Sequence, residues 1–495
     1  MRRFLYSISI AAALALSAAP ALADDSPAKG DDKAKIELPP MSPDKSIEQS
    51  VVVDGHPLRY TATVGHIDVH DAKGKTIGQV VYTAYRVPSR TARPVTFAFN
   101  GGPGASSVFL NMGAIGPKKV NFGVQGDSPS DPAILHDNPQ TWLDFTDLVF
   151  IDPIGTGFSR SLEDADATKK DFYDSKTDIE YLSRVVYDWL VKNGRMTSRK
   201  YLIGESYGGF RVPKLAYELQ ARMGVGVSGM VMVSPYLDPA ATGRETALSP
   251  LPWMINLPAM AAGHFEREGD LTPEKMAEVE NYTRTQFVTD FLAGTSNQAA
   301  TDRLSAHVAE LTGLDPVLVR RLNGRVDIET YLREIRRSTG QVGSVYDSNV
   351  TAYDPFPGSA EPRYNDPLLD GIMAPTTSAA VDFITNQVEW KDDAHYETLS
   401  YDVNKDWKRD DSDSPVTDLR KAIGNDPKMA VMIAHGWDDL SCPYFGSKLI
   451  VDQMPNHGPF QNVQLHVYPG GHMFYARPAS AAKFKADAER IYGAR

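Results

Sequence analysis

The sequence predicts an α/β protein whose central sheet is mostly parallel. Three observations indicate this: short apolar runs alternate with helix patterns, hairpin patterns precede them, and a helical stretch interrupts them. The apolar runs lie at residues 95–99, 148–152, 201–203, 230–233, 429–434 and 463–468. Apolar strands separated by helices are typical of a parallel sheet with helices on both faces.

The segment before the first apolar run predicts antiparallel hairpins. Alternating patterns at 50–54 and 58–64 flank Gly55-His56-Pro57, and those at 67–70 and 77–85 flank Asp71-Ala72-Lys73-Gly74. Turn-forming residues between alternating runs indicate hairpins. We expect these hairpins at one edge of the sheet.

Two helices are predicted beside the middle strands. Residues 178–192 carry apolar side chains on one helical face, and Asn193-Gly194 ends the pattern. Residues 212–223 form the second helix. Each helix lies between two buried-strand patterns, as the connections of a parallel sheet do.

Residues 240–400 break this alternation and predict a mainly helical cap inserted into the sheet domain. Helix patterns occur at 274–293, 301–311, 316–322 and 328–337, before a Gly/Pro/Asp/Tyr-rich stretch at 340–370. The insertion divides the core into a first part, residues 46–239, and a second part, residues 401–495.

The first residues predict an export signal. Arg2 and Arg3 precede an apolar stretch at 10–22, and Ala21-Leu22-Ala23 fits cleavage after Ala23. The alternative is an N-terminal membrane anchor, for which the apolar stretch is short. We therefore expect a signal peptide at 1–23, a disordered tether at 24–45, and a periplasmic or secreted protein that leaves the membrane after cleavage.

Composition excludes several functional classes. Removing Arg2 and Arg3 takes the formal net charge from −12 to −14, which disfavours nucleic-acid binding. Cys442 is the single cysteine, so no intrachain disulfide can form. No Cys/His cluster has zinc-ligand spacing, and we expect neither a metal nor an organic cofactor. The oligomeric state has no signature in the sequence.

The pentapeptide Gly204-Glu205-Ser206-Tyr207-Gly208 is a G-x-S-x-G motif between a predicted strand and a predicted helix. In that context the motif forms a sharp turn that lifts the serine hydroxyl off the sheet edge, beside a helix N-terminus. The alternative is a tight turn with an incidental serine. The context favours a nucleophile at Ser206 and hence the α/β-hydrolase fold.

A serine nucleophile needs a base and a third group that orients the base, and in this fold the acid precedes the histidine. His472 follows the strand pattern at 463–468 through a Pro-Gly-Gly loop, so we expect the base there. Asp438 and Asp439 both follow the strand pattern at 429–434 and both fit the acid. Surface or structural roles are expected for His66, His70, His307, His395 and His435.

The motifs together resemble the serine carboxypeptidase family, which contains cathepsin A and the fungal and plant vacuolar carboxypeptidases. They span residues 50–480 in the family's order, and we identify the chain as a bacterial member. The matching segments are Asn100-Gly101-Gly102-Pro103-Gly104-Ala105-Ser106-Ser107, Asn138-Pro139 with Trp142, Ile151-Asp152, Gly157-Phe158-Ser159, residues 204–209, residues 436–443 and Gly471-His472-Met473.

The resemblance implies roles for the catalytic groups. The register from Gly436 to Pro443 places the family's acid at Asp439. The family's oxyanion hole corresponds to the backbone N–H groups of Gly102 and Tyr207. Such donors stabilise charge that develops on the substrate carbonyl oxygen.

The resemblance also implies a site for the substrate's C-terminal carboxylate. Asn100, the N–H of Gly101 and Glu205 match the family's positions. A glutamate beside a carboxylate is repulsive unless one of the two is protonated. This explains why such enzymes favour acidic conditions.

Three positions depart from the family. Ala98 stands where a tryptophan is frequent, Ala114 where a second glutamate usually partners the first, and Ala105 where the family has a cysteine. The first two weaken the expectation of carboxylate recognition. We hypothesise that Glu205 titrates lower than in relatives and that the pH optimum moves toward neutrality.

The expected activity is that of a serine-type carboxypeptidase, which removes C-terminal amino acids from peptides through an acyl-enzyme on Ser206. An esterase or acyltransferase would use the same triad, because fold and triad do not determine the substrate. A binding scaffold without catalysis is a further alternative, which the intact set of triad residues disfavours.

Overall fold

The computed structural model describes residues 38–120, 130, 132–238, 248–359, 361–410, 412–455 and 463–493. The predicted signal peptide and most of the predicted tether lie outside these residues. Two compact units divide the chain, Met1–Pro40 and Met41–Arg495. In the second unit Met41 is already buried, and Asp44 bonds Tyr82 at 2.8 Å and Lys192 at 2.8 Å. Ordered packing therefore begins before residue 45, the predicted end of the tether.

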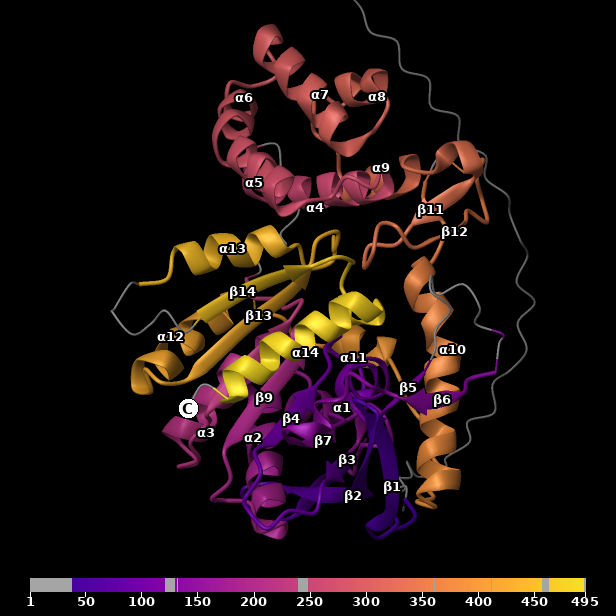
Figure 1. Cartoon of the computed structure of the whole chain (residues 1–495), viewed down its shortest axis with the longest axis vertical. Helices are drawn as coiled ribbons and strands as arrows, with labels where there is room; N and C mark the ends of the chain where they lie inside the picture. Colours follow the sequence, from indigo (N-terminus) through magenta and orange to yellow (C-terminus); the bar gives the residue numbers. More distant parts are fainter. Residues whose placement is uncertain are drawn as a thin grey trace, which may run out of the picture. The chain divides into compact units, whose positions relative to one another are not determined.

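Within the described residues ten strands form one sheet in the order β1-β2-β3-β7-β4-β9-β10-β13-β14, with β8 paired to β3 (Figure 1). All neighbours from β7 to β14 run parallel, whereas β1, β2, β3 and β7 pair antiparallel. The strands are β1 (Lys45–Val53), β2 (His56–His70), β3 (Thr76–Arg86), β4 (Val95–Phe99), β7 (Asp147–Ile151), β8 (Arg160–Ser161), β9 (Lys200–Glu205), β10 (Gly229–Val233), β13 (Ala430–Gly436) and β14 (Val463–Tyr468). The predicted α/β-hydrolase sheet with N-terminal hairpins is confirmed.

Strand β2 is one long strand where two shorter strands were predicted. It continues through Gly65 and His66 because these residues pair with Tyr82 and Val81 of β3, although the pairing with β1 ends at Val64. The hairpin before it turns at Asp54-Gly55, where both residues have positive φ, 50° and 79°. Two such residues form the tight turn that suits the twist of a hairpin.

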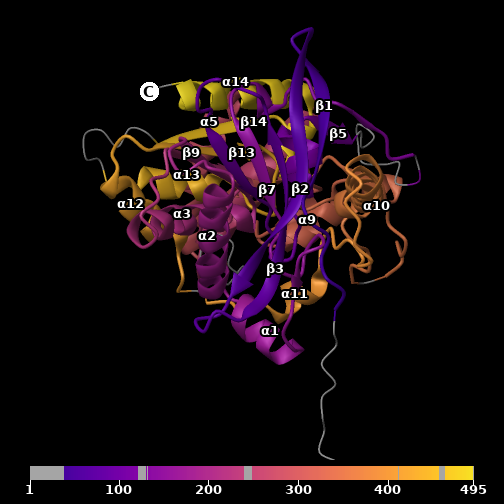
Figure 2. The same cartoon turned by 90° about the horizontal axis from the view of Figure 1, so that it is seen from below.

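Helices cover both faces of the sheet (Figure 2). One face packs against α2 (Ser175–Lys192), α3 (Tyr207–Ala221) and α12 (Pro415–Asn425), and the other against α10 (Pro367–Asp382) and α14 (Pro478–Gly493). Strand β9 shows the alternation, because Leu202 points to the first face and Ile203 to the second. The side chain of Asp174 caps α2 by accepting the N–H of Thr177.

The first part of the predicted cap has a hydrophobic cluster of its own. The cluster joins helices α4 to α9 and meets the sheet domain at Leu440, Tyr444 and Phe445. Its helices are α4 (Leu251–Arg267), α5 (Pro273–Tyr282), η4 (Thr283–Phe287), α6 (Val288–Leu292), α7 (Gln298–Thr312), α8 (Pro316–Arg321) and α9 (Ile328–Glu334).

The second part of the predicted cap packs differently. Helix α10 and the short π-helix η6 (Phe383–Gln387) belong to the cluster that covers the sheet together with α14. The sequence patterns missed α4 and α10 because Pro258 and Pro375 lie inside these helices. Proline opposes a helix interior, but here both prolines are buried in tertiary packing.

Shorter elements connect these layers. They are η1 (Leu110–Ile115), β5 (Lys118–Val120), β6 (Leu135–Asp137), η2 (Trp142–Asp144), α1 (Ala165–Phe172), η5 (Arg337–Thr339), β11 (Gln341–Gly343), β12 (Thr351–Tyr353), α11 (Tyr401–Asp406), α13 (Tyr444–Asp452) and η8 (Phe474–Ala476). Among the described residues, β5 pairs with β6 and β11 with β12 as two small ribbons.

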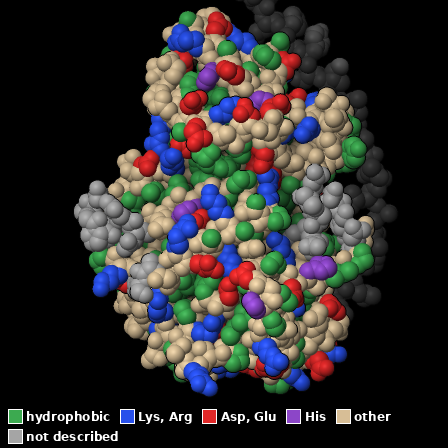
Figure 3. All heavy atoms as spheres, viewed as in Figure 1, with side chains coloured by type: hydrophobic (Ala, Val, Ile, Leu, Met, Phe, Trp, Pro, Cys, Tyr) green, Lys and Arg blue, Asp and Glu red, His purple; other side chains and the backbone are tan. Residues whose placement is uncertain are grey.

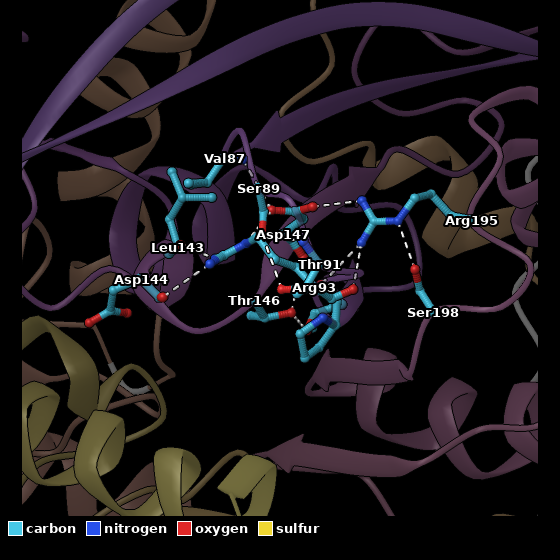
Figure 4. Close-up of polar contacts among 12 residues, drawn as sticks. Val87, Ser89, Thr91, Arg93, Leu143, Asp144, Thr146, Asp147, Arg195 and Ser198 are labelled. Carbon is cyan, nitrogen blue, oxygen red and sulfur yellow. Dashed lines mark hydrogen bonds and ion pairs between the residues drawn. The ribbon is translucent and has the colours of Figure 1, made fainter.

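A buried ion cluster fixes the amino ends of β4 and β7. Asp147 accepts Nε of Arg93 at 3.0 Å and Nη1 of Arg195 at 2.6 Å, and Arg195 also donates to Ser198 at 2.8 Å (Figure 4). The carboxylate of Asp147 is 3% exposed. This cluster lies at the opposite end of the strands from the serine motif.

Charges of both signs are interspersed over the face of the molecule that Figure 3 shows. Among the helices that the structure describes, none is both long enough and apolar enough to cross a membrane.

Candidate active site

Ser206 occupies a strained turn between β9 and α3. Its backbone has φ 59° and ψ −121°, a region that residues with a side chain rarely adopt. The N–H of Ser206 donates to the carbonyl of Val233 at 2.9 Å, which ties the turn to β10. A Cβ added at Gly204 would overlap the carbonyl oxygen of Gly208, so glycine is needed for the close approach of the strand to the helix.

His472 lies in the loop after β14, and Asp439 lies in the loop after β13. Nδ1 of His472 is 2.8 Å from Oδ2 of Asp439, and both side chains are buried. Oδ1 of Asp439 accepts the N–H groups of Ser441 at 2.8 Å and Cys442 at 3.0 Å. Burial lowers the pKa of His472, but the charge and the hydrogen bond of Asp439 outweigh burial and raise it above its usual value.

Asp438, the other candidate acid, faces away from this pair. It lies beside Asp347, Glu266 and Arg477, and Arg477 forms ion pairs with both of those acids. Burial, followed by the charges of Asp347 and Glu266, raises the pKa of Asp438 well above its ordinary value. The geometry thus brings His472 together with Asp439 and not with Asp438.

The predicted oxyanion donors lie beside the serine. Tyr207 is the first residue of α3, so its N–H has no partner within the helix. A Cβ added at Gly101 would lie 2.5 Å from the nitrogen of Tyr207 and 2.9 Å from Cβ of Ser206. The backbone at Gly101 therefore packs directly against the turn that carries Ser206, and Gly102 lines the same cavity as Ser206.

The predicted carboxylate-binding residues are buried next to these donors. Asn100 and Glu205 are each 2% exposed, and Oδ1 of Asn100 accepts the N–H of Leu110 at 2.9 Å. Burial raises the pKa of Glu205 to about 6, against the opposing effects of His472, Tyr475 and Asn100. Glu205 is thus a perturbed carboxyl even though Ala114 supplies no second acid.

Tyr475 is a site residue that the sequence did not indicate. Its hydroxyl donates to Oε2 of Glu205 at 2.7 Å, and its side chain is 2% exposed. The sequence offered one hint of this role, because Tyr475 lies three residues after His472, but the matched family motif ends at Met473. Ala98 and Ala114 are both buried and are not among the residues that line the cavity.

One cavity of about 330 Å³ brings the predicted groups together. It is lined by Asn100, Gly101, Gly102, Glu205, Ser206, Tyr207 and His472, while Asp439 lies behind His472. Its remaining walls include the apolar or aromatic side chains of Phe109, Tyr236, Tyr346, Leu369, Leu399, Trp407 and Met473, and the charged residues Lys408, Arg409 and Asp410.

His435, for which a structural role was expected, lies on a core strand and does not line the cavity. His435 is buried on β13 and bonds Ser447 at 2.8 Å, and burial lowers its pKa to about 4. It is therefore a neutral, structural histidine. In the described part of the chain, no three His, Cys, Asp or Glu side chains are placed to hold a metal ion.

The fold and the site define an α/β-hydrolase with a serine at the strand–helix turn and a histidine–aspartate pair beside the same cavity. The family model described as serine carboxypeptidase matches residues 54–468. The chain therefore belongs to the serine carboxypeptidase family.

Individual relatives are distant. The pheromone-processing carboxypeptidase KEX1 of Yarrowia lipolytica is 24% identical over 402 residues, which cover 81% of this chain and 58% of the relative. Serine carboxypeptidase-like 44 of Arabidopsis thaliana is 32% identical over 158 residues, which cover 31% of this chain and 29% of the relative. The matches thus span less than two thirds of either relative's length.

A solved structure supports the fold. The crystal structure of the prohormone-processing carboxypeptidase KEX1(delta)p from Saccharomyces cerevisiae matches with a TM-score of 0.56 and 16% identity. The match covers 88% of this chain and 91% of the other. At that identity the likeness establishes the α/β-hydrolase fold alone.

Proposed function

We propose that the chain is a serine-type carboxypeptidase that releases the C-terminal amino acid of a peptide. The observation that carries this proposal is the buried pair Asn100 and Glu205 in the cavity that Ser206 and His472 also line. An amide and a protonatable carboxyl beside the nucleophile suit a substrate whose terminal carboxylate adjoins the scissile bond.

The reaction would begin with attack of Ser206 Oγ on the last peptide carbonyl. His472 Nε2 accepts the hydroxyl proton and later gives it to the leaving amine, while Asp439 holds Nδ1 protonated and orients the ring. The N–H groups of Gly102 and Tyr207 stabilise the tetrahedral oxyanion. Water then hydrolyses the acyl-enzyme by the same proton transfers.

Glu205 would recognise the substrate carboxylate in its protonated form. A protonated carboxyl donates a hydrogen bond to the carboxylate, whereas an ionised one repels it. With burial raising its pKa to about 6, Glu205 is protonated in mildly acidic solution. This observation supports an acidic preference for free-carboxylate substrates, while the hypothesis that Glu205 titrates lower than in relatives stays a prediction.

The cellular setting belongs to the same proposal. The N-terminal residues support export to the periplasm or the medium, with removal of residues 1–23. An exported carboxypeptidase would act on peptides outside the cytoplasm without a metal or organic cofactor.

The test compares a blocked dipeptide with its C-terminally amidated and esterified forms, using Ser206→Ala as the control for triad-dependent turnover. Preference for the free acid, lost in Ser206→Ala, would support the proposal. Triad-dependent ester cleavage without that preference would identify an esterase or acyltransferase instead. Absence of turnover and of labelling by a fluorophosphonate would indicate a binding scaffold.

A further inference from the structure

Tyr475 is the residue whose side chain holds Glu205. It lies in η8, directly after the loop of His472, and its hydroxyl donates to Oε2 of Glu205 at 2.7 Å. Its own backbone carbonyl accepts Nζ of Lys119 at 3.0 Å, and its ring packs edge-on against Phe474. Both the ring and the backbone of Tyr475 are therefore held in place from outside the cavity.

The groups around Glu205 come from the segments that follow β4, β13 and β14. His472 and Asp439 act through their charges, Asn100 and Tyr475 through hydrogen bonds, and Cys442 is a neighbouring buried thiol. Within the described residues no second carboxyl group is hydrogen-bonded to Glu205. Position 114, which the family resemblance assigns to such a group, is a buried alanine in η1.

We propose that Tyr475 is a positioning residue that takes the place of a second carboxylic acid, so that recognition of the substrate's carboxylate depends on the protonation of Glu205 alone. The proposal rests on the proposed function, because it concerns the same subsite. A phenol hydroxyl can donate to the glutamate without adding a second titrating charge.

The Tyr475 hydroxyl determines in which direction the pKa of Glu205 shifts. Burial and the charge of Glu205 raise the pKa of Tyr475 well above its usual value, so the hydroxyl stays protonated throughout the working pH range. A constant donor stabilises the ionised form of Glu205 and lowers its pKa relative to the same site without the hydroxyl. Removing the hydroxyl should therefore keep Glu205 protonated to higher pH.

The experiment measures kcat/KM from pH 4.5 to 9 for a blocked dipeptide with a free C-terminal acid and for its C-terminal amide. The same peptide bond is hydrolysed in both substrates. Both substrates need neutral His472, so their ratio isolates the protonation of Glu205. For the wild type we expect the logarithm of this ratio to fall at high pH with a slope of −1 against pH, as the loss of a single proton requires.

In Tyr475→Phe the midpoint of this fall should move to higher pH, and the ratio in the alkaline arm should rise about tenfold, since a hydrogen bond to a charged group is worth roughly one pKa unit or more. The change should lie in KM for the acid and leave the amide profile in place. The control is Tyr468→Phe, which removes a buried hydroxyl that donates to Asp487 at 2.6 Å outside the cavity. That control should leave the ratio unchanged.

An unmoved midpoint in folded Tyr475→Phe, or the same shift in Tyr468→Phe, would overturn the inference. If Tyr475→Phe does not fold, the wild type still tests the inference. One titrating acid gives the logarithm of the acid-to-amide ratio a slope of −1 against pH on the alkaline side, whereas two titrating acids give a slope of −2 and would contradict the inference. A wild type without preference for the acid over the amide would defeat the proposed function itself, which is a different outcome.

Discussion

Nδ1 of His472 lies 2.8 Å from Oδ2 of Asp439, while Oδ1 of the same carboxylate accepts two backbone N–H groups. Three donors thus satisfy a carboxylate that is fully buried. A hydrogen on Nδ1 fits this arrangement, and Nε2 would then be the atom that accepts the serine proton in the proposed mechanism. The neighbouring Asp438 has no such contact with the histidine.

The first prediction separates the two aspartates by their asparagine variants. Asp439→Asn should lower kcat by about 10⁴-fold, because the amide cannot hold the imidazole in the required tautomer. Asp438→Asn should retain kcat within about tenfold, since its side chain contacts neither His472 nor the substrate cavity. Steady-state hydrolysis of a blocked peptide ester measures both, and a greater loss in Asp438→Asn would reverse the assignment of the acid.

A second prediction concerns the glycine against the serine turn. In Gly101→Ala the new Cβ would lie 2.5 Å from the nitrogen of Tyr207, so the oxyanion donor must move. We expect kcat to fall by about 10²-fold or more. Gly226→Ala is the matched control, because a Cβ there meets nothing within 4 Å. Equal activity of the two variants would show that the N–H of Tyr207 is not used in the reaction.

The sequence predicted the sheet because its buried strands are short apolar runs bounded by turn residues. It divided β2 at Gly65 and His66, where the alternating pattern fails and the pairing with β1 has ended, although the pairing with β3 continues. It missed α4 and α10, since Pro258 and Pro375 have a low intrinsic helix propensity. Tertiary packing accommodates both prolines inside these helices.

For the site, local sequence motifs identified the residues in the loops after the strands. They did not reveal which of these residues contact one another across distant segments. Ser206 and His472 stood out because glycine-rich turns follow predicted strands. Chain order alone left Asp438 and Asp439 open, because both follow the same strand. The register of the family motif favoured Asp439, and the contact with His472 is what the structure adds. Tyr475 could not be found in this way, as its bond to Glu205 joins residues 270 positions apart.

The third prediction tests the ion cluster at the opposite end of the sheet. Asp147→Asn leaves Arg93 and Arg195 largely buried without their carboxylate, and the free energy of unfolding should fall by about 3–5 kcal/mol. Glu163→Gln, which breaks the ion pair with the exposed Lys75, should cost about 1 kcal/mol or less. Urea unfolding of both variants measures the difference, and kcat of the folded proteins should match the wild type. Similar destabilisation by both changes would argue against a structural role for the Asp147 cluster.

A fourth prediction follows from the pKa of Glu205, which burial raises to about 6. Under the proposed function, the protonated carboxyl binds a substrate carboxylate below this pH, and above it the two ionised groups would repel each other. Glu205→Gln cannot ionise, so the ratio of kcat/KM for the free acid to that for the amide should become independent of pH. At pH 8 the variant should exceed the wild type in this ratio. A ratio in Glu205→Gln that still falls with pH would assign the titration to another group.

The last prediction uses Asp438 as a sensor of stability. Because burial raises its pKa in the folded protein, the native state binds a proton that the unfolded state releases at about pH 4. The unfolded state then binds fewer protons above that pH, so this residue makes the free energy of unfolding fall as pH rises. Asp438→Asn removes the effect, and its melting temperature relative to the wild type should increase between pH 5 and pH 8. A difference that stays constant or decreases over that interval would mean that Arg477 keeps Asp438 ionised in the folded protein, despite the charges of Asp347 and Glu266.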